Sequence, residues 1–234
     1  MQDVLQYVTT DAAIVTEPTD LEVCLAHKGF CWIDVITEGR AAHGSRVDLG
    51  IDANLRMGRL LGQLERLEQQ LRTSYSHPLV GPPSLHAAVL RGGTGPSTYA
   101  AECRLEIERR TIPGETKEQV MGEIEDIARR LSADDPTFKA QIHPSLWRDP
   151  FEVSADAGIV MALKTAAAEV LGREPACSGQ TPWMDAAFLG GAGIETVVMG
   201  ASGAGAHAAE EWVEIDSVVS LAEILARTAE AYCA

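Results

Sequence analysis

The sequence contains no apolar run long enough to form a membrane-spanning helix. Its first residues, Met-Gln-Asp-Val-Leu, lack the basic stretch and apolar core of a signal peptide. Basic residues are scarce relative to acidic ones, and the formal net charge of −15 argues against binding to nucleic acid or to anionic membranes. We therefore expect a soluble cytoplasmic enzyme or binding protein.

Paired cysteine motifs are also missing. The chain has five cysteines, an odd number, and no C-x-x-C pair, which favours reduced and mostly buried thiols. No H-E-x-x-H sequence and no P-loop is present. Any catalytic or metal site must therefore be assembled by the fold from residues that lie far apart in the sequence.

The middle of the chain has alternating and helical patterns in a regular order. Apolar residues alternate with polar ones at 31–37 and at 99–110, whereas residues 53–71 carry one apolar stripe at helical spacing. Thr116 and Gln119 form a capping box before a second amphipathic helix. With strands at 85–91 and 137–143, the order is β-α-β-β-α-β, which predicts a ferredoxin-like domain at residues 27–146.

The flanking segments, residues 1–26 and 147–234, predict a small α/β domain that this insert interrupts. The expected elements are a strand at 11–17, a return linker around Trp147, helices at 155–171 and 216–232, the latter with Asp216 as N-cap, and an apolar strand at 196–199. Between them we expect a tight turn at 178–180 and a short helix with Thr181 as N-cap and Pro182 at its first position. Such a small layer suggests part of a larger sheet.

Two residues at strand ends are candidate metal ligands. Glu17 ends the first predicted strand, and a glycine-rich loop after residue 199 leads to His207, which Glu210 and Glu211 follow. A carboxylate and a neutral imidazole both suit zinc. On its own, however, Glu17 is better explained as a solvated residue of its turn.

Several motifs occur in a characteristic order. They are Glu17-Pro-Thr, His27-Lys-Gly, Gly39-Arg-Ala-Ala-His43-Gly-Ser, Glu108-Arg-Arg110-Thr-Ile-Pro-Gly-Glu, Gly179-Gln-Thr-Pro-Trp-Met-Asp185 and His207-Ala-Ala-Glu-Glu-Trp-Val. From about Ala12 to Tyr232 the chain resembles the dinuclear zinc amidohydrolases that include acetylornithine deacetylase, succinyl-diaminopimelate desuccinylase, aminoacylase and glutamate carboxypeptidase. The resemblance implies a zinc-peptidase-like catalytic domain with a lid that forms a homodimer.

The resemblance also implies residue roles. Glu17 would bind one metal and His207 the other, with Zn²⁺ expected and Co²⁺ as an alternative. His43 would reach into the partner's active site and donate to the oxyanion of the tetrahedral intermediate. His43 could instead be a loop residue with no such contact.

Further residues would bind a small amide substrate that carries a carboxylate. Arg110 would pair with that carboxylate, although the neighbouring Arg109 could serve instead. Thr181 and Asp185 would line the site. Backbone N–H groups near Ser202 and Gly203 could hold a carboxylate or carbonyl oxygen.

The largest departure from the family is at the start of the chain. The resemblance places a metal histidine, a bridging aspartate and a general-base glutamate before the Glu-Pro-Thr motif. Residues 1–16 contain no histidine and only two acids, Asp3 and Asp11. We therefore expect a C-terminal portion that binds no metal tightly and is inactive alone. Whether an N-terminal half exists as a separate chain stays open. A smaller departure, Ser97 and Ala100 in the lid's substrate turn, leaves the substrate side chain open.

Three functions remain open. Metal-dependent hydrolysis of an N-acyl amino acid or small peptide is the leading interpretation. A non-catalytic module that dimerises or binds a carboxylated ligand is the second. The third is a serine hydrolase using Ser202, but Gly200-Ala-Ser-Gly-Ala204 departs from G-x-S-x-G at its last position. Dimerisation would use an edge strand of the lid or the helix at 53–71.

Overall fold

A computed structural model describes residues 4–7, 9–206 and 208–234 and divides them into two compact units. The first unit comprises the described residues up to Lys28 together with Pro78–Val80 and Asp149–Ala234. The second comprises Gly29–His77 and Gly81–Arg148. None of the described helices combines the length and apolarity needed to cross a bilayer.

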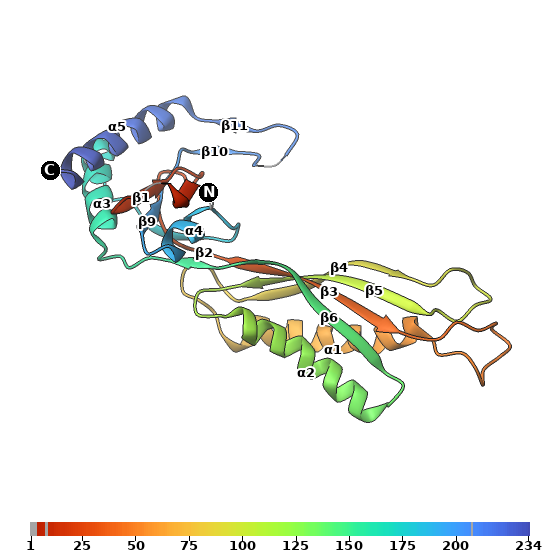
Figure 1. Ribbon diagram of the computed structural model, residues 1–234. Helices are drawn as coiled ribbons and strands as arrows, with labels where there is room; N and C mark the ends of the chain where they lie inside the picture. Colours follow the sequence, from red (N-terminus) through yellow and green to blue (C-terminus); the bar gives the residue numbers. More distant parts are fainter. Residues whose placement is uncertain (1–3, 8, 207) are drawn as a thin grey trace. The chain divides into compact units, whose positions relative to one another are not determined.

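The second unit is a four-stranded antiparallel sheet with two helices on one face (Figure 1). Its elements are β3 (Gly29–Glu38), α1 (Ala53–Ser74), β4 (Ser84–Gly92), β5 (Glu102–Thr111), α2 (Lys117–Asp134) and β6 (Lys139–Arg148). The strand order is β4-β5-β3-β6, so the two central strands are not consecutive in the chain. This arrangement confirms the ferredoxin-like β-α-β-β-α-β prediction.

The core of this unit follows directly from the alternation in its central strands. Every second residue of β3 and β5 is buried and packs on α1 and α2, among them Ile33, Val35, Leu105 and Ile107. Asp52 caps α1 by accepting from two backbone N–H groups. The predicted capping box of α2 is confirmed, with both of its hydrogen bonds present.

Strand β6 is longer than expected. Trp147 and Arg148, predicted to lie in a linker, are the last residues of the strand, and Pro144 lies within it. A register shift between Trp32 and Ile33 of β3 accommodates this region. Proline is tolerated here because β6 is an edge strand, where its missing N–H interrupts no second ladder.

The first unit contains a five-stranded mixed sheet in the order β1-β9-β2-β7, with β8 also paired to β2. Its strands are β1 (Ala12–Val15), β2 (Val23–His27), β7 (Phe151–Glu152), β8 (Cys177–Gln180) and β9 (Glu195–Val198), after a short 3-10 helix η1 (Val4–Gln6). Helices α3 (Gly158–Leu171) and α5 (Ile215–Tyr232) share its larger core, and α4 (Ala186–Gly191) joins a smaller one. Strands β10 (Gly203–Ala204) and β11 (Trp212–Val213) form a separate antiparallel pair.

Some local predictions for this unit are wrong. Strand β2 was not predicted, because all of its residues are buried and it shows no alternation. Residues 178–180 lie in strand β8 rather than in a turn, paired in parallel with β2. Gly179 permits this because a Cβ there would lie 2.6 Å from the carbonyl oxygen of Leu79.

The helix starts also differ from the prediction. Helix α4 begins at Ala186 with Asp185 as N-cap, so Thr181 caps no helix. Met184 is buried, and the Trp183 indole Nε1 donates to the carbonyl of Asp149 at 3.1 Å, so packing holds residues 181–185 outside a helix. Helix α5 has Glu214 rather than Asp216 as its N-cap.

A buried arginine links strand β5 to helix α2. Arg109 is fully buried and forms ion pairs with Glu115 and Glu123, the latter at 3.2 Å from Nε. It also donates to the carbonyl of Arg110 at 2.6 Å, and Glu115 accepts from the N–H of Ile112 at 2.9 Å. The turn between β5 and α2 is therefore organised around this one guanidinium.

We predict that Arg109→Ala lowers the free energy of unfolding of this unit by about 3–5 kcal/mol, because two partly buried carboxylates lose their counter-ion. Urea unfolding followed by circular dichroism measures the change. Arg129→Ala is the matched control, since Arg129 pairs with Asp126 on the exposed surface and should matter little. Equal effects of the two variants would contradict this role of Arg109.

The cysteines give a second test of the packing. Burial raises the pKa of Cys24 and Cys31 to about 11, whereas Cys177 and Cys233 are exposed. A maleimide at neutral pH should therefore label Cys177 and Cys233 rapidly and the three buried thiols only after denaturation, as measured by peptide mass spectrometry.

The same pKa shift predicts how stability changes in alkaline solution. An unfolded thiol has a pKa near 9.0, so between pH 9 and 11 the unfolded chain releases protons that the folded chain retains, and stability should fall over this range.

In the maleimide experiment, rapid labelling of Cys24 or Cys31 in the folded protein would contradict the described core.

Candidate functional site

The parallel strands β1 and β9 end side by side, and both candidate segments leave from this point. The N–H of Met199 donates to the carbonyl of Val15 at 3.0 Å. Immediately beyond, the N–H of Gly200 donates to Oγ1 of Thr19 at 3.0 Å, and the N–H of Leu21 donates to the carbonyl of Gly200 at 2.9 Å. The Glu-Pro-Thr turn and the glycine-rich loop are thus bound to each other at the carboxyl ends of the strands, where α/β sheets commonly form ligand sites.

This contact requires glycine at position 200. A Cβ there would lie 2.0 Å from the carbonyl oxygen of Glu17, so any side chain would force the two segments apart. Asp20 and Leu21 in the same turn have φ values of 55° and 59°, in the left-handed region that most residues avoid. Such strained residues are enriched at binding sites, where the surrounding structure holds them.

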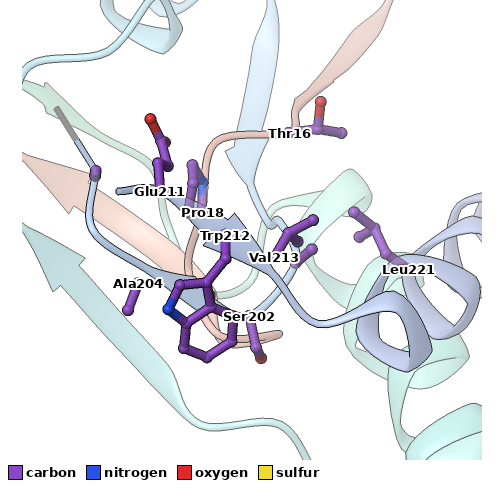
Figure 2. A pocket seen from close by; sticks show the side chains of 11 residues that line it. Thr16, Pro18, Ser202, Ala204, Glu211, Trp212, Val213 and Leu221 are labelled. Atoms are coloured by element: carbon purple, nitrogen blue, oxygen red, sulfur yellow. The ribbon is translucent and has the colours of Figure 1, made fainter. Parts of the chain in front are cut away.

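A cavity of about 430 Å³ lies beside this turn, between the β10–β11 pair and the start of helix α5 (Figure 2). Its lining residues come from both candidate segments: Thr16, Pro18, Ala201, Ser202, Gly203, Ala204, Ala206, Glu211, Trp212, Val213 and Leu221. The two neighbours of Glu17 and the predicted substrate residues Ser202 and Gly203 therefore border one space. Trp212 and Val213, the last two residues of the His207 motif, had no predicted role and supply its apolar wall.

The backbone of Ser202 is already engaged within the protein. Its N–H donates to Oγ of Ser217 at 2.9 Å, and its carbonyl accepts from the N–H of Glu214 at 2.9 Å. Ser217 is buried, which makes this a structural contact that fixes the loop on helix α5. The N–H of Ser202 is thus occupied by Ser217.

The described residues do not by themselves fit a catalytic zinc ion. Glu17 is exposed and lies two residues beyond Val15, the last residue of β1, rather than ending the strand as predicted. His207, predicted to bind the other metal, lies outside the described residues. Within residues 4–7, 9–206 and 208–234, no group of three or more histidine, cysteine or carboxylate side chains could hold a metal ion. A catalytic zinc requires about three protein ligands, and these described residues alone do not provide them.

Thr181 and Asp185 lie beyond the end of β8 in the same unit. Thr181 is exposed, and Asp185 is half-buried and makes no side-chain hydrogen bond to the helix it precedes. Nearby, His27 is fully buried, with its ring stacked on Phe151 at 5.3 Å and its Nδ1 3.0 Å from the carbonyl oxygen of Lys28. His27 is therefore a packing residue at the base of this segment.

His43 belongs to the other compact unit, in the loop between β3 and α1. This loop pairs with the loop between β4 and β5: the N–H of Gly44 donates to the carbonyl of Ser97 at 2.8 Å, and the N–H of Tyr99 donates to that of Ala42 at 2.9 Å. The imidazole itself is exposed. Of the two positions that depart from the family, Ser97 is exposed and Ala100 is buried under this pairing.

The structure distinguishes the two adjacent arginines of β5. Arg109 is buried on the helix-covered face and committed to Glu115 and Glu123. Arg110 projects from the opposite face, with its guanidinium 5.4 Å from the centre of the Phe30 ring and 3.7 Å from Glu108. Of the two candidates for the substrate carboxylate, only Arg110 is on the accessible face.

Comparisons with known proteins agree with the motif pattern. Residues 25–136 match the family model of the M20 peptidase dimerisation domain. Acetylornithine deacetylase of Myxococcus xanthus is 31% identical over 230 residues, which cover 94% of this chain and 57% of the relative. N-formyl-4-amino-5-aminomethyl-2-methylpyrimidine deformylase of Bacillus subtilis is 28% identical over 245 residues, covering 92% of this chain and 56% of the relative. The chain thus spans little more than half the length of these curated relatives.

Solved structures share the fold across nearly the whole chain. Aminopeptidase PepT from Bacillus cereus superposes with a TM-score of 0.79 at 16% identity, covering 98% of this chain and 59% of that one. An M20 family metallo-carboxypeptidase from Sulfolobus solfataricus has a TM-score of 0.73 at 15% identity, covering 99% and 65%. The solved structures show the shared fold, and the matched dimerisation domain together with the deacetylase similarity places the chain in the M20 family.

Proposed function

We propose that this chain is the lid-bearing portion of a metal-dependent hydrolase that cleaves an amide bond in an N-acyl amino acid or small peptide. The observation that carries this proposal is the 31% identity to an acetylornithine deacetylase along 94% of the chain. The similarity to a deformylase supports the same reaction class, since both names describe removal of an acyl group from nitrogen.

In this proposal Glu17 and His207 each contribute one ligand to a pair of zinc ions, with cobalt as an alternative metal. The other ligands and the general base come from polypeptide outside this sequence. The apolar surface beside the cavity supports such a neighbour: Trp212, Val213 and Ile215 are 55%, 51% and 77% exposed. Apolar side chains clustered to this extent usually mark a surface that another polypeptide covers.

The substrate is proposed to be a small amide with a carboxylate. Arg110 supplies the guanidinium for that carboxylate, supported by its position on the accessible face of β5. Thr181, Asp185 and Gly203 line the site, and His43 donates to the oxyanion from the partner subunit. Because the N–H of Ser202 is occupied by Ser217, Ser202 serves in this proposal as a wall residue.

A homodimer is proposed to form through β4 and α1 of the lid. Leu90 of β4 is in register with the buried Leu105 and so lies on the helix-covered face, yet it is 54% exposed. A groove of about 390 Å³ runs between α1 and β4, lined in part by Leu61, Leu64 and Leu85. The other edge, β6, contains Pro144 and is less suited to pairing.

A non-catalytic module that dimerises or binds a carboxylated ligand is the second candidate. It is favoured by one observation, that the described residues include no group of three metal-binding side chains. The two candidates differ in whether the chain supports turnover once the rest of the catalytic domain is supplied.

This difference can be tested with a hybrid in which the chain replaces the aligned 230 residues of the Myxococcus xanthus relative. We expect the folded hybrid to hydrolyse N-acyl amino acids when zinc or cobalt is added, and the 234-residue chain alone to show no turnover. Arg110→Ala should lower kcat/KM by roughly 10- to 150-fold, the effect of losing a charged hydrogen bond of about 1.5–3 kcal/mol.

Arg129→Ala is the matched control for Arg110→Ala in the hybrid. Because Arg129 lies on the exposed surface of α2, its replacement should leave kcat/KM unchanged. A hybrid that has native circular dichroism and binds zinc but hydrolyses nothing would contradict the hydrolase and favour the second candidate. Activity in the isolated chain would show that the proposed dependence on further residues is wrong.

Sedimentation equilibrium tests the proposed dimer. We expect a dimer at micromolar concentration that Leu90→Lys weakens at least tenfold, since a charge would be buried at the paired edge. Val47→Lys, at a loop position that is 78% exposed, should leave the dimer unchanged. A monomeric parent chain, or equal effects of both variants, would exclude the β4–α1 interface.

A further inference from the structure

The His43 side chain has a defined hydrogen-bonding arrangement although it lies on an exposed loop. The backbone N–H of Ser45 donates to its Nδ1 at 3.2 Å, and Oγ of Ser45 lies 2.8 Å from the same nitrogen. A backbone N–H can only donate, so Nδ1 must present its lone pair. In the neutral ring the proton is therefore on Nε2.

The backbone on both sides of His43 is held as well. Its carbonyl accepts from the N–H of Arg46 at 2.8 Å, and an isolated β-bridge joins it to Thr98. Gly50 lets the end of the loop pack closely, because a Cβ there would lie 2.3 Å from the Tyr99 ring. These contacts fix the point from which the imidazole projects.

Both contacts at Nδ1 come from Ser45, a neutral residue. The nearby charged side chains are engaged elsewhere: Arg46 pairs with Asp48 at 3.3 Å, and Nε of Arg40 donates to the carbonyl of Leu49. A histidine that donates from Nδ1 to a carboxylate has its Nε2 free to accept a proton. The arrangement at His43 is the opposite one, in which Nε2 is the donor.

We propose that Ser45 is a positioning residue that holds His43 in the Nε2–H tautomer, so that the loop presents an N–H donor to an acceptor oxygen. The identity of that acceptor, the oxyanion of an amide substrate, rests on the proposed function. The tautomer of His43 and its dependence on Ser45 are independent of the proposed function. Ser45 acts through His43 and need not touch the substrate.

Long-range ¹H–¹⁵N NMR of the 234-residue chain reads the tautomer directly, at a pH where the imidazoles are neutral. The His43 signals are assigned by their loss in His43→Gln. We expect the Nε2–H pattern in the parent chain. Ser45→Ala removes the hydroxyl contact and keeps the backbone N–H, so the pattern should shift part of the way towards the mixture of both tautomers found in a free histidine peptide. Ser45→Thr, which keeps a hydroxyl, should restore it.

Ser97→Ala is the matched control, because Ser97 lies in the paired loop and contributes its backbone carbonyl. This variant should leave the His43 tautomer unchanged. Circular dichroism of each variant separates a change at the imidazole from loss of the fold. An Nδ1–H pattern in the parent chain, or a Ser45→Ala spectrum identical to it, would overturn the positioning role.

The NMR result is independent of turnover, so the two proposals can fail separately. An inactive hybrid with His43 in the Nε2–H form would contradict the proposed amide substrate and leave the role of Ser45 intact. An active hybrid in which Ser45→Ala lowers kcat, with Ser45→Thr restoring it and KM unchanged, would extend that role to the reaction.

Discussion

The close approach of Gly200 to the carbonyl of Glu17 is the constraint on which the rest of the candidate site depends. It aligns the end of β9 with the turn after β1, where the side-chain hydroxyl of Thr19 accepts from the N–H of Gly200 and the N–H of Leu21 donates to the carbonyl of Gly200. The glycine-rich loop leaves the sheet at this point and continues into β10. The β10–β11 pair and the cavity lined by Trp212 lie beyond this point.

The second unit is stabilised on a different principle. Its sheet is covered by helices on one face only, so the alternation of β3 and β5 separates a buried face from a polar one. Arg109 is the exception, a charge on the buried face that is accommodated by Glu115 and Glu123. Its neighbour Arg110 thereby remains on the open face, where a ligand can reach it.

The two units carry complementary parts of the proposed chemistry. One presents Glu17 and a cavity with an apolar wall, and the other presents His43, Arg110 and a dimerisation domain. The chain covers 57% of the length of the deacetylase relative, and in the proposed function the remaining zinc ligands come from polypeptide outside this sequence. In that assembly the exposed Trp212 and Ile215 would be covered.

The sequence alone determined the features that arise from local patterns. The ferredoxin-like order follows from period-2 alternation, helical apolar stripes and the capping box at Thr116. The family follows from motifs in order. The choice between Arg109 and Arg110 stayed open in the sequence, and only the structure shows Arg109 buried between Glu115 and Glu123.

Only the tertiary structure decided features that depend on contacts between distant residues. Strand β2 is buried along its whole length and has no periodicity to reveal it, and β8 is a strand because β2 lies beside it. Thr181 has good capping chemistry, yet the burial of Met184 moves the helix start to Ala186. Likewise, the contacts between Ser45 and Nδ1 of His43, on which the proposed tautomer rests, depend on the folded loop, since the same residues in an extended chain would leave Nδ1 open to water.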